Sequence, residues 1–320
     1  MNLYELGWDA SFAEAFAPYE RDGLIPARVA ARHHGPCELL TGRGRLGGMP
    51  AGRLSRSGLP AVGDWVAARP LAGERRALIE AVLPRRTAFR RKEAWRRSVE
   101  QVVAANVDTV FLLTAFGHDL SPRRLERYLT AAADSGAEPV VVVNKLDLAA
   151  RPGPGLDALE AVAGGAPVLA VSAATGQGLA ALEAWLSRGA TVALLGSSGV
   201  GKSTLANALL GRPLLPTAPT SAGGRGRHTT SRRDLVLLPC GALLLDTPGM
   251  RELQLWSDEG ALDASFGEIA ELAGACRFAD CTHEHEPGCA VREAVPPGRL
   301  AGYRKLHGEL RTLATRRGGR

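Results

Sequence analysis

The chain has 320 residues, a formal net charge of +6 and 45% hydrophobic residues. This length allows two or three domains, each with a core of its own. The chain contains no run of about 18 apolar residues, and its first residues show no basic segment followed by an apolar run. We therefore expect a cytoplasmic protein that neither crosses nor binds a membrane.

The first hundred residues predict a short helix followed by a small barrel. Apolar spacing from Leu6 to Phe16 predicts a helix that ends at Ala17-Pro18. Short β-like runs then alternate with glycine and proline, at residues 25–30, 37–41, 61–66 and 77–82. Short strands at regular spacing are typical of a small β-barrel.

Basic residues concentrate in the predicted barrel. Residues 21–98 contain 17 Arg and Lys against 6 Asp and Glu. An arginine-rich barrel has the electrostatics of an RNA-binding surface, and the alternative is a solvated basic face. Trp65, Phe89 and Trp95 are available to stack on bases, although Trp65 fits the barrel core equally well.

Apolar strands alternate with helices from residue 108 onwards. The pattern predicts strands at residues 108–113, 139–143, 168–171, 191–195, 234–238 and 242–246, and helices at 122–136, 179–186 and 205–210. Such alternation indicates an α/β fold with a parallel sheet and helices on both faces. Ligands of these folds bind at the carboxyl ends of the strands.

A phosphate-binding loop follows the strand at 191–195. Residues 196–204 match G-x-x-x-x-G-K-[ST], and a predicted helix comes after them. Backbone N–H groups and the helix start would surround a polyphosphate, while the lysine reaches its outer phosphates. A glycine-rich turn with a chance lysine does not explain the complete motif and both flanks. The predicted nucleotide-binding residues are Gly196, Ser197, Ser198, Gly199, Val200, Gly201, Lys202, Ser203 and Thr204.

Two further strand ends predict that the base is guanine. Asn144-Lys145-Leu146-Asp147 follows one strand, and Ser172-Ala173 follows the next. The Asp147 carboxylate can accept hydrogen bonds from the guanine ring N–H and amine, which adenine lacks. Asn144 can tie the loops together, the Lys145 stem can lie against the base, and the Ser172-Ala173 backbone can donate to the guanine carbonyl. The predicted nucleotide is GTP.

Residues for Mg²⁺ and for the γ-phosphate lie after the loop. A long polar segment at 215–233 contains Thr229 and Thr230, of which we favour Thr230 as a Mg²⁺ ligand beside Ser203. The strand at 242–246 ends in Asp246-Thr-Pro-Gly249. There Asp246 would bind the Mg²⁺ shell and the Gly249 amide would face the γ-phosphate.

Met250 follows Gly249, where many GTPases carry a glutamine that orients the attacking water. A thioether cannot orient water, so we expect slow intrinsic hydrolysis that something else assists. His228 is either the group that assists it or a solvent-facing loop histidine.

The order of these motifs is unusual. In ordinary GTPases the phosphate loop precedes the base-reading motifs, whereas here Asn144 and Ser172 precede Gly196. The domain therefore looks circularly permuted. The old ends would join through residues 180–189, and the new ends would open after Gly249.

A cluster of cysteines and histidines near the carboxyl end predicts a closed zinc site. Cys276, Cys281, His283 and Cys289 supply three thiolates and one imidazole within fourteen residues, a set that suits structural Zn²⁺. His285 is a rival to His283, and the alternative is a set of free cysteines in a small core. From residue 297 the tail predicts an arginine-rich helix.

Taken together, these features resemble the RsgA (YjeQ) family of ribosome small-subunit-dependent GTPases. The resemblance covers nearly the whole chain, through the permuted motifs, the Cys/His spacing, Leu6-Gly-Trp-Asp9, Gly63-Asp-Trp-Val66 and Gly226-Arg-His-Thr-Thr230. It implies an amino-terminal OB-fold, a permuted GTPase domain and a mainly helical zinc domain, which we place at residues 1–98, 99–257 and 258–320. Where the family often has a third threonine, this chain has Ser231, which keeps Thr229 open as the Mg²⁺ ligand.

The resemblance also implies a function. We expect a monomeric GTPase that assists late maturation of the small ribosomal subunit, binds its 16S rRNA, and hydrolyses GTP to GDP when that subunit stimulates it. The rival hypothesis is a non-catalytic RNA-binding protein that nucleotide merely orders. A metabolite kinase would leave residues 144–147, the basic barrel and the Cys/His set without a role.

Overall fold

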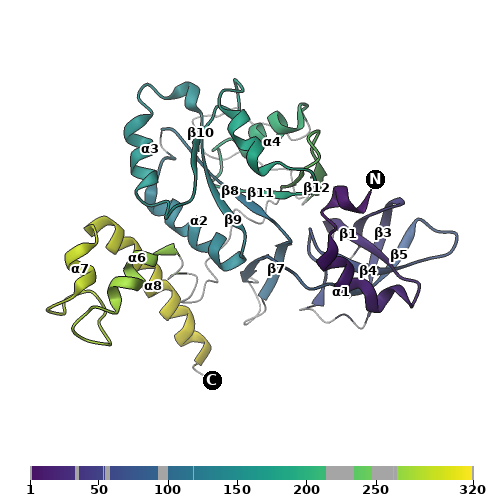
Figure 1. Ribbon diagram of the computed structural model, residues 1–320, viewed down its shortest axis with the longest axis horizontal. Coiled ribbons are helices and arrows are strands. Elements are labelled where there is room, and N and C mark those ends of the chain that lie inside the picture. The colour runs from purple at the N-terminus through teal and green to yellow at the C-terminus, as the bar shows by residue number, and fades with distance from the viewer. Residues whose placement is uncertain are drawn as a thin grey trace.

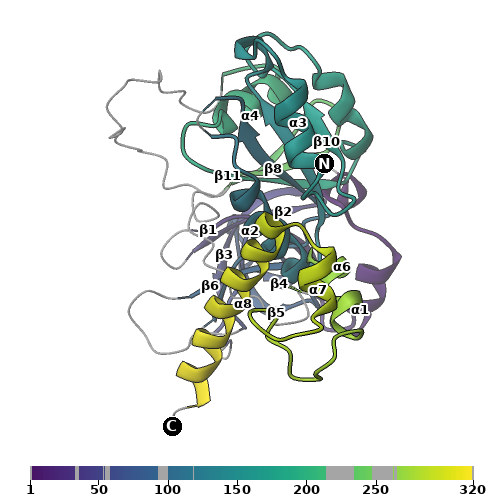
Figure 2. The ribbon, with the colours of Figure 1, turned by 90° about the vertical axis from the view of Figure 1, so that its left-hand side faces the viewer.

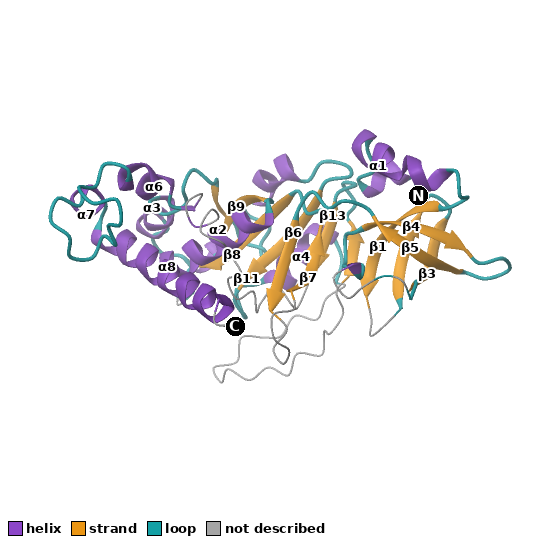
Figure 3. Ribbon diagram, turned by 90° about the horizontal axis from the view of Figure 1, so that it is seen from below, coloured by secondary structure: helices purple, strands orange, loops and turns teal. Residues whose placement is uncertain are grey.

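The computed structural model describes residues 2–32, 36–52, 54, 58–92, 100–117, 119–213, 234–246, 262 and 265–318. These residues form three regions in a row, which are a barrel, a central sheet flanked by helices, and a helical carboxy-terminal region (Figures 1 and 3). None of the described helices is long and apolar enough to cross a membrane.

A closed five-stranded barrel forms the amino-terminal region. Its strands are β1 (Ile25–Arg32), β2 (Cys37–Thr41), β3 (Gly44–Pro50), β4 (Trp65–Pro70) and β5 (Arg76–Val82). They pair in the order β1-β2-β3-β5-β4, and β4 returns to β1. The predicted barrel is thereby confirmed. Strand β3 was not predicted because three of its seven residues are glycine, and β4 begins later than the predicted run at 61–66.

Two short helices and an aromatic cluster cover the barrel. η1 (Leu3–Leu6) precedes α1 (Ala10–Glu20), which begins at the capping side chain of Asp9. The prediction that this helix ends at Ala17-Pro18 is wrong, because Pro18 lies within its last turn. Phe12 packs against Trp8 and Trp65, with ring centroids 6.0 and 5.8 Å away, and this packing holds the helix in place.

The barrel's aromatic and basic residues do not all face solvent. Trp65 and Phe89 are at most 1% exposed, so neither can stack on a base, and Trp95 lies outside the described residues. Arg85 forms a two-pronged ion pair with the buried Asp64, with both N–O distances at 2.7 Å. Part of the positive charge predicted for an RNA surface is therefore internal.

A hairpin connects the barrel to the central sheet. It consists of β6 (Ala88–Lys92) and β7 (Glu100–Ala105), which pair antiparallel. Neither strand is predicted from the sequence. In β6 three of the five residues are arginine or lysine, which conceals the strand pattern.

The central part of the sheet has six strands in the order β10-β9-β8-β11-β13-β12, and β12 pairs antiparallel with β1 of the barrel, so the strands of both regions are hydrogen-bonded in one continuous order. All six central strands are parallel except β12, which is antiparallel to β13. The strand that precedes the phosphate loop, β11, lies inside the sheet but comes fourth along the chain, as the circular permutation predicts. The strands are β8 (Thr109–Ala115), β9 (Glu138–Asn144), β10 (Val168–Ala170), β11 (Thr191–Gly196), β12 (Asp234–Leu237) and β13 (Leu243–Asp246).

Helices cover both faces of this sheet. α2 (Pro122–Ser135) and α3 (Gly153–Glu160) pack on one face, while α4 (Lys202–Leu210) and η4 (Leu179–Trp185) pack on the other. The helix predicted at residues 179–186 is present as η4, which has the tighter 3-10 form. The short η3 (Leu146–Leu148) follows β9.

The carboxy-terminal region is helical, as expected. It contains α6 (Gly267–Ala273), α7 (Ala290–Ala294) and α8 (Pro297–Gly318). Their apolar side chains form a small core of their own, made of Leu262, Phe266, Ile269, Cys289, Val291, Val295, Leu300 and Leu306.

Arg28 of β1 joins the barrel to the central sheet. Its side chain is 2% exposed and lies 5.6 Å from the ring centre of Trp65. The guanidinium donates to Gly63 O at 3.3 Å, Asn106 O at 3.0 Å, Thr191 Oγ1 at 2.8 Å and Leu6 O. Because Thr191 begins β11, the barrel is tied to the strand that carries the phosphate loop.

Arg299 of α8 joins the carboxy-terminal region to the central sheet. It bridges Glu126 of α2 at 3.2 Å and Glu268 of α6 at 2.6 Å, and it stacks on Phe266 at 3.9 Å. The helices approach closely here, since a Cβ at Gly302 would lie 2.2 Å from the Glu126 carboxylate. Figure 2 shows α8 running in front of α2.

Candidate nucleotide site and metal cluster

The carboxyl ends of three parallel strands bring the predicted nucleotide-binding residues together. Asn144 ends β9, Ser172 and Ala173 follow β10, and the phosphate loop begins at the end of β11. Because β8 pairs with both β9 and β11, the base-reading residues and the phosphate loop share one edge of the sheet. This is where open α/β sheets bind ligands.

Asn144 links the three loops at this edge. Its side-chain N–H donates to Val200 O in the phosphate loop at 2.8 Å, and its Oδ1 accepts from Ala173 N at 2.9 Å. The side chain is 2% exposed, so both bonds lie away from water, where a lost partner is costly. Asn144 therefore ties the loop predicted to read the base to the phosphate loop.

Asp147 is positioned by the second base-reading loop. The buried Ser172 hydroxyl donates to Asp147 Oδ1 at 2.5 Å. Asp147 itself is exposed, and Lys145 before it adopts a left-handed backbone with φ of 63°. The carboxylate thus faces solvent from a fixed position, with acceptor capacity left for a ligand.

The phosphate loop has the backbone expected of an anion cradle. Gly201 adopts φ of 97°, and a Cβ there would lie 2.3 Å from the Asn144 amide nitrogen, so only glycine fits. Lys202 begins α4 and is 7% exposed. Its ammonium donates to Gly196 O at 2.7 Å and to Ser197 O, inside the curve of the loop. Ser198 and Gly199 at the tip are exposed.

Asp119 is a neighbour of the phosphate loop that the sequence analysis missed. It follows β8 at the same edge of the sheet, and its Oδ1 accepts from Ser197 Oγ at 2.5 Å. The same oxygen forms an ion pair with Arg124 in the first turn of α2. The rule that chemistry collects at strand ends would have found Asp119, since it lies four residues after Ala115.

The structure describes only some of the residues predicted for Mg²⁺ and hydrolysis. Ser203 lies in the first turn of α4, partly exposed beside the phosphate loop. Asp246 ends β13 on the parallel partner of β11, and its backbone is described. His228, Thr229, Thr230, Gly249 and Met250 lie outside the described residues.

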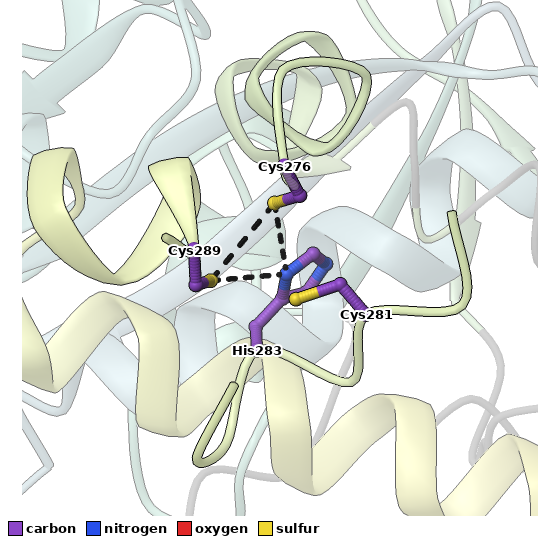
Figure 4. Close-up of side chains that lie close together, drawn as sticks. All are labelled: Cys276, Cys281, His283 and Cys289. Carbon is purple, nitrogen blue, oxygen red and sulfur yellow. Dashed lines mark hydrogen bonds between the residues drawn. The ribbon is translucent and has the colours of Figure 1, made fainter. Parts of the chain in front are cut away.

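Cys276, Cys281, His283 and Cys289 form one cluster in the carboxy-terminal region (Figure 4). Their ligand atoms all lie within 4.8 Å of one another. The Sγ atoms of Cys276 and Cys289 are 3.9 Å apart, and His283 Nδ1 lies 3.6 and 3.5 Å from them. Tetrahedral Zn²⁺ with Zn–S bonds of ~2.3 Å needs sulfur separations of about 3.8 Å, so the donor set fits this metal.

The cluster distinguishes between the two candidate histidines. His283 is 6% exposed and lies among the cysteines, whereas the His285 side chain is 93% exposed. His283 adopts φ of 62°, and Arg304 of α8 donates to its carbonyl oxygen. Cys289 caps the start of α7, where its Sγ accepts from Arg292 N at 3.4 Å. Several secondary-structure elements thus hold the four side chains around one point.

Comparison with known proteins agrees with this geometry. The sequence model of the family described as RsgA GTPase matches residues 82–256. The "Small ribosomal subunit biogenesis GTPase RsgA" of Opitutus terrae is 51% identical, over 99% of this chain and 92% of its own length. The protein of the same name from Streptomyces coelicolor is 44% identical, over 98% of this chain and 88% of its own.

Solved structures show the same fold. The crystal structure of YjeQ from Thermotoga maritima superposes with a TM-score of 0.69 at 28% identity, over 90% of this chain and 98% of that one. YloQ, described as a circularly permuted GTPase, superposes with a TM-score of 0.64 at 22% identity, over 90% and 96% of the two chains. The chain therefore belongs to the RsgA family of circularly permuted GTPases, as its motif order and its Cys/His spacing predicted.

Proposed function

We propose that this GTPase assists late maturation of the small ribosomal subunit in the cytoplasm, as a monomer that binds 16S rRNA and is stimulated by the subunit to convert GTP and water to GDP and phosphate. One structural observation supports the nucleotide assignment above others. Asn144 joins the base-reading loop to the phosphate loop through bonds of 2.8 and 2.9 Å. The names of the relatives support the ribosomal role. We place the domains at residues 1–98, 99–257 and 258–320.

Each described residue of the nucleotide site has a role in this proposal. Asp147, positioned by Ser172, reads the guanine N–H groups, and the Ala173 backbone contacts the guanine carbonyl. The Lys145 stem lies against the base. Lys202 exchanges its bonds to Gly196 O and Ser197 O for bonds to phosphate oxygens. The remaining phosphate contacts come from the backbone of residues 196–204.

Mg²⁺ fits this donor set as an oxygen-seeking ion. Ser203, Asp246 and Thr230 would hold it, with Thr229 as the alternative to Thr230. When bound, the ion would supply positive charge that offsets the negative charge developing on the phosphates during hydrolysis. Gly249 would face the γ-phosphate. We propose His228 as the group that orients water, since Met250 cannot.

Zn²⁺ in the Cys₃His cluster would have a structural role. All four donors come from the protein, which leaves no open position for a substrate or water. The cluster lies against the small core that also contains Cys289 and Leu306. Zinc would therefore stabilise the region that Arg299 attaches to the central sheet.

GTP turnover titrated separately with small and large ribosomal subunits tests this function. We expect slow turnover alone, a rise of at least about a hundredfold with small subunits, and no rise with large ones. Equal turnover with both subunits would contradict the assignment of the partner. Binding of GTP and RNA without any turnover would establish the non-catalytic rival instead.

Base specificity is tested by Asp147→Asn, with Asp157→Asn as the matched control. Asp157 is an exposed carboxylate on α3, ten residues along the chain. Asp147→Asn should lower the affinity for GTP by about a hundredfold or more, because an amide cannot accept both guanine N–H groups. Asp157→Asn should leave the affinity unchanged. Equal affinities of the two variants would exclude Asp147 as the base reader.

A further inference from the structure

The Asp119 carboxylate lies beside the phosphate loop, after the carboxyl end of β8. Its Oδ1 accepts from Ser197 Oγ at 2.5 Å and also forms an ion pair with Arg124 in the first turn of α2. Asp119 Oδ2 is buried and accepts no hydrogen bond from the residues that the structure describes. The described contacts of this side chain therefore converge on one oxygen, which joins the phosphate loop to α2.

Strand β8 holds Asp119 in place. Thr114 Oγ1, near the end of this strand, donates to Asp119 O at 2.8 Å. The same strand runs directly beside the start of the phosphate loop, because Leu113 is paired with Gly196. A Cβ at Gly196 would lie only 2.5 Å from Leu113 O. The carboxylate is thus attached to the strand that also supports the start of the loop.

Ser197 is held through both its carbonyl and its hydroxyl. Lys202 Nζ donates to the carbonyl oxygen, and Asp119 accepts from the hydroxyl. A polyphosphate in a loop of this type attracts the lysine, so the bond from Lys202 to the carbonyl would be given up when nucleotide binds. The bond between Ser197 and Asp119 can hold the curve of the loop after Lys202 has moved.

A carboxylate beside a phosphate site needs a compensating cation. Asp119 would repel the oxygens of a bound nucleotide, and the repulsion grows with the number of phosphates. Arg124 offsets this charge, and the two side chains are only 38% and 22% exposed, so water screens their pair in part. The alternative is that Asp119 only stabilises the start of α2, where a negative charge is favourable. That alternative gives the hydrogen bond from Ser197 no role.

We propose that Asp119 is a positioning residue of the phosphate loop, which holds the Ser197 hydroxyl while Arg124 balances its charge. The proposal rests on the nucleotide site given above. Asp119 acts through Ser197 and does not contact the nucleotide itself. The loop then depends on a residue outside its own motif, 78 residues earlier in the chain.

Two double variants separate the hydrogen bond from the charge. Asp119→Asn/Arg124→Gln and Asp119→Ala/Arg124→Gln carry the same local charge, but only the first keeps an acceptor for Ser197. The asparagine variant should bind GDP within about threefold of the wild type, and the alanine variant about tenfold more weakly than the asparagine variant. The matched control is Asp157→Ala/Arg151→Gln, at exposed positions of the same domain, and it should bind like the wild type.

Ser197→Ala removes the same bond without changing either charge. It should also weaken GDP binding by about tenfold, and adding it to Asp119→Ala/Arg124→Gln should cause no further loss, because both changes remove one bond. Ser197 is partly exposed, and an unchanged urea midpoint checks that the variant is folded. Equal GDP affinity of the asparagine and alanine double variants, or additive losses, would overturn the positioning role.

Arg124→Gln alone tests the balancing charge. It leaves the Asp119 carboxylate negative, so a non-hydrolysable GTP analogue should bind about tenfold more weakly and GDP about threefold more weakly. Adding Asp119→Asn should recover most of both losses, and Arg151→Gln should change neither affinity. Equal losses for the two nucleotides would show that Arg124 supports only the fold of α2.

The wild type tests the nucleotide site independently of Asp119. If the wild type failed to bind GDP, the proposed nucleotide site would be refuted whatever the variants do. Tight binding by the wild type together with unchanged binding by all the variants would refute only the role of Asp119.

Discussion

Two buried arginines attach the central sheet to its neighbours, and their partners differ in kind. Arg28 donates to three backbone carbonyls and the Thr191 hydroxyl, so its direct partners are neutral. Burial lowers the pKa of Arg28 to about 10, although Asp108 and Asp64 counteract this in part. Arg299 instead forms ion pairs with Glu126 and Glu268.

Because their partners differ in charge, the Arg28 junction and the Arg299 junction should respond differently to pH and to salt. Carbonyl acceptors do not titrate, and their positions are fixed by the barrel and the sheet. The barrel junction should therefore be insensitive to protonation and transmit movement directly to β11. At the other junction the Glu268 carboxylate is about half exposed, so salt can screen its ion pair with Arg299. The carboxy-terminal region should consequently be the part that detaches more easily.

Removal of zinc should produce the largest difference between the junctions. Structural zinc contributes about 10–16 kcal/mol of apparent folding free energy in small zinc domains. A chelator, or Cys289→Ser, should abolish amide protection in α6 and α7 while β1 and β4 keep theirs. Hydrogen exchange measures this, and Cys240→Ser, at an exposed cysteine, is the control. If the amides of α6 stayed protected from exchange without metal, the apolar core of the carboxy-terminal region would be enough to keep that region folded.

Arg28→Met should weaken the barrel junction by about 3–5 kcal/mol, because it strands buried carbonyls at Leu6 and Asn106 without donors. Urea unfolding measures the loss. Arg32→Met on the same strand is the matched control. Arg32 is itself partly exposed and donates to a single carbonyl, Pro60 O at 3.1 Å, so its loss should cost about 1 kcal/mol. Equal losses would contradict the special role of Arg28.

At the junction between α2 and α8, substitution of Arg299 and substitution of Glu126 should destabilise the protein by different amounts. Arg299→Met leaves the Glu126 carboxylate buried without its cation, and should cost about 2–4 kcal/mol in thermal unfolding of the carboxy-terminal region. Glu126→Gln retains an acceptor for Arg299 and should cost about 1 kcal/mol or less. The double variant should cost less than the sum. A larger loss of stability for Glu126→Gln than for Arg299→Met would contradict this explanation.

The smallest predicted effect is on the pH dependence of stability, to which Glu126 and Asp9 should contribute in opposite directions. Burial raises the pKa of Glu126 above its ordinary 4.5, so the folded state binds more protons than the unfolded one in the window above 4.5. Its contribution to stability falls as pH rises through that window, and acidification from neutral pH strengthens the α2–α8 junction. Glu126→Gln should remove this dependence, measured as unfolding free energy between pH 7 and 4.5.

Asp9 at the barrel should respond in the opposite direction. The hydrogen bond from Arg86 lowers the pKa of Asp9 below its ordinary 3.8. The stability that Asp9 contributes is present above 3.8 and is lost as pH falls through the lowered value. Asp9→Asn should remove this acid sensitivity of α1, followed by hydrogen exchange. If the stability contributions of Asp9 and Glu126 changed in the same direction with pH, the predicted contrast between them would be wrong.

Most of the nucleotide site and the metal cluster could be predicted from the sequence, because each motif is local. The residues 144–147, 172–173 and 196–204 each follow an apolar strand directly, and parallel strands necessarily bring their carboxyl ends together. The four zinc-type donors lie within fourteen residues. The motif order likewise indicates the circular permutation, because Asn144 and Ser172 precede Gly196 in the chain.

The sequence left several choices open or hidden. It favoured His283 with His285 as a rival, and the burial of His283 among the cysteines supports His283. Strand β3 was missed because its glycines carry no side-chain pattern. Asp119 was missed because a single aspartate after a strand has no motif.

The junctions were decided only by the tertiary structure. Arg28 and Thr191 are separated by 163 residues, and Arg299 and Glu126 by 173. In the sequence Arg28 is one of many basic residues of the barrel, indistinguishable from those on its surface. Its role depends on which carbonyls and hydroxyls surround it once the sheet and barrel meet, and long-range packing alone determines that environment.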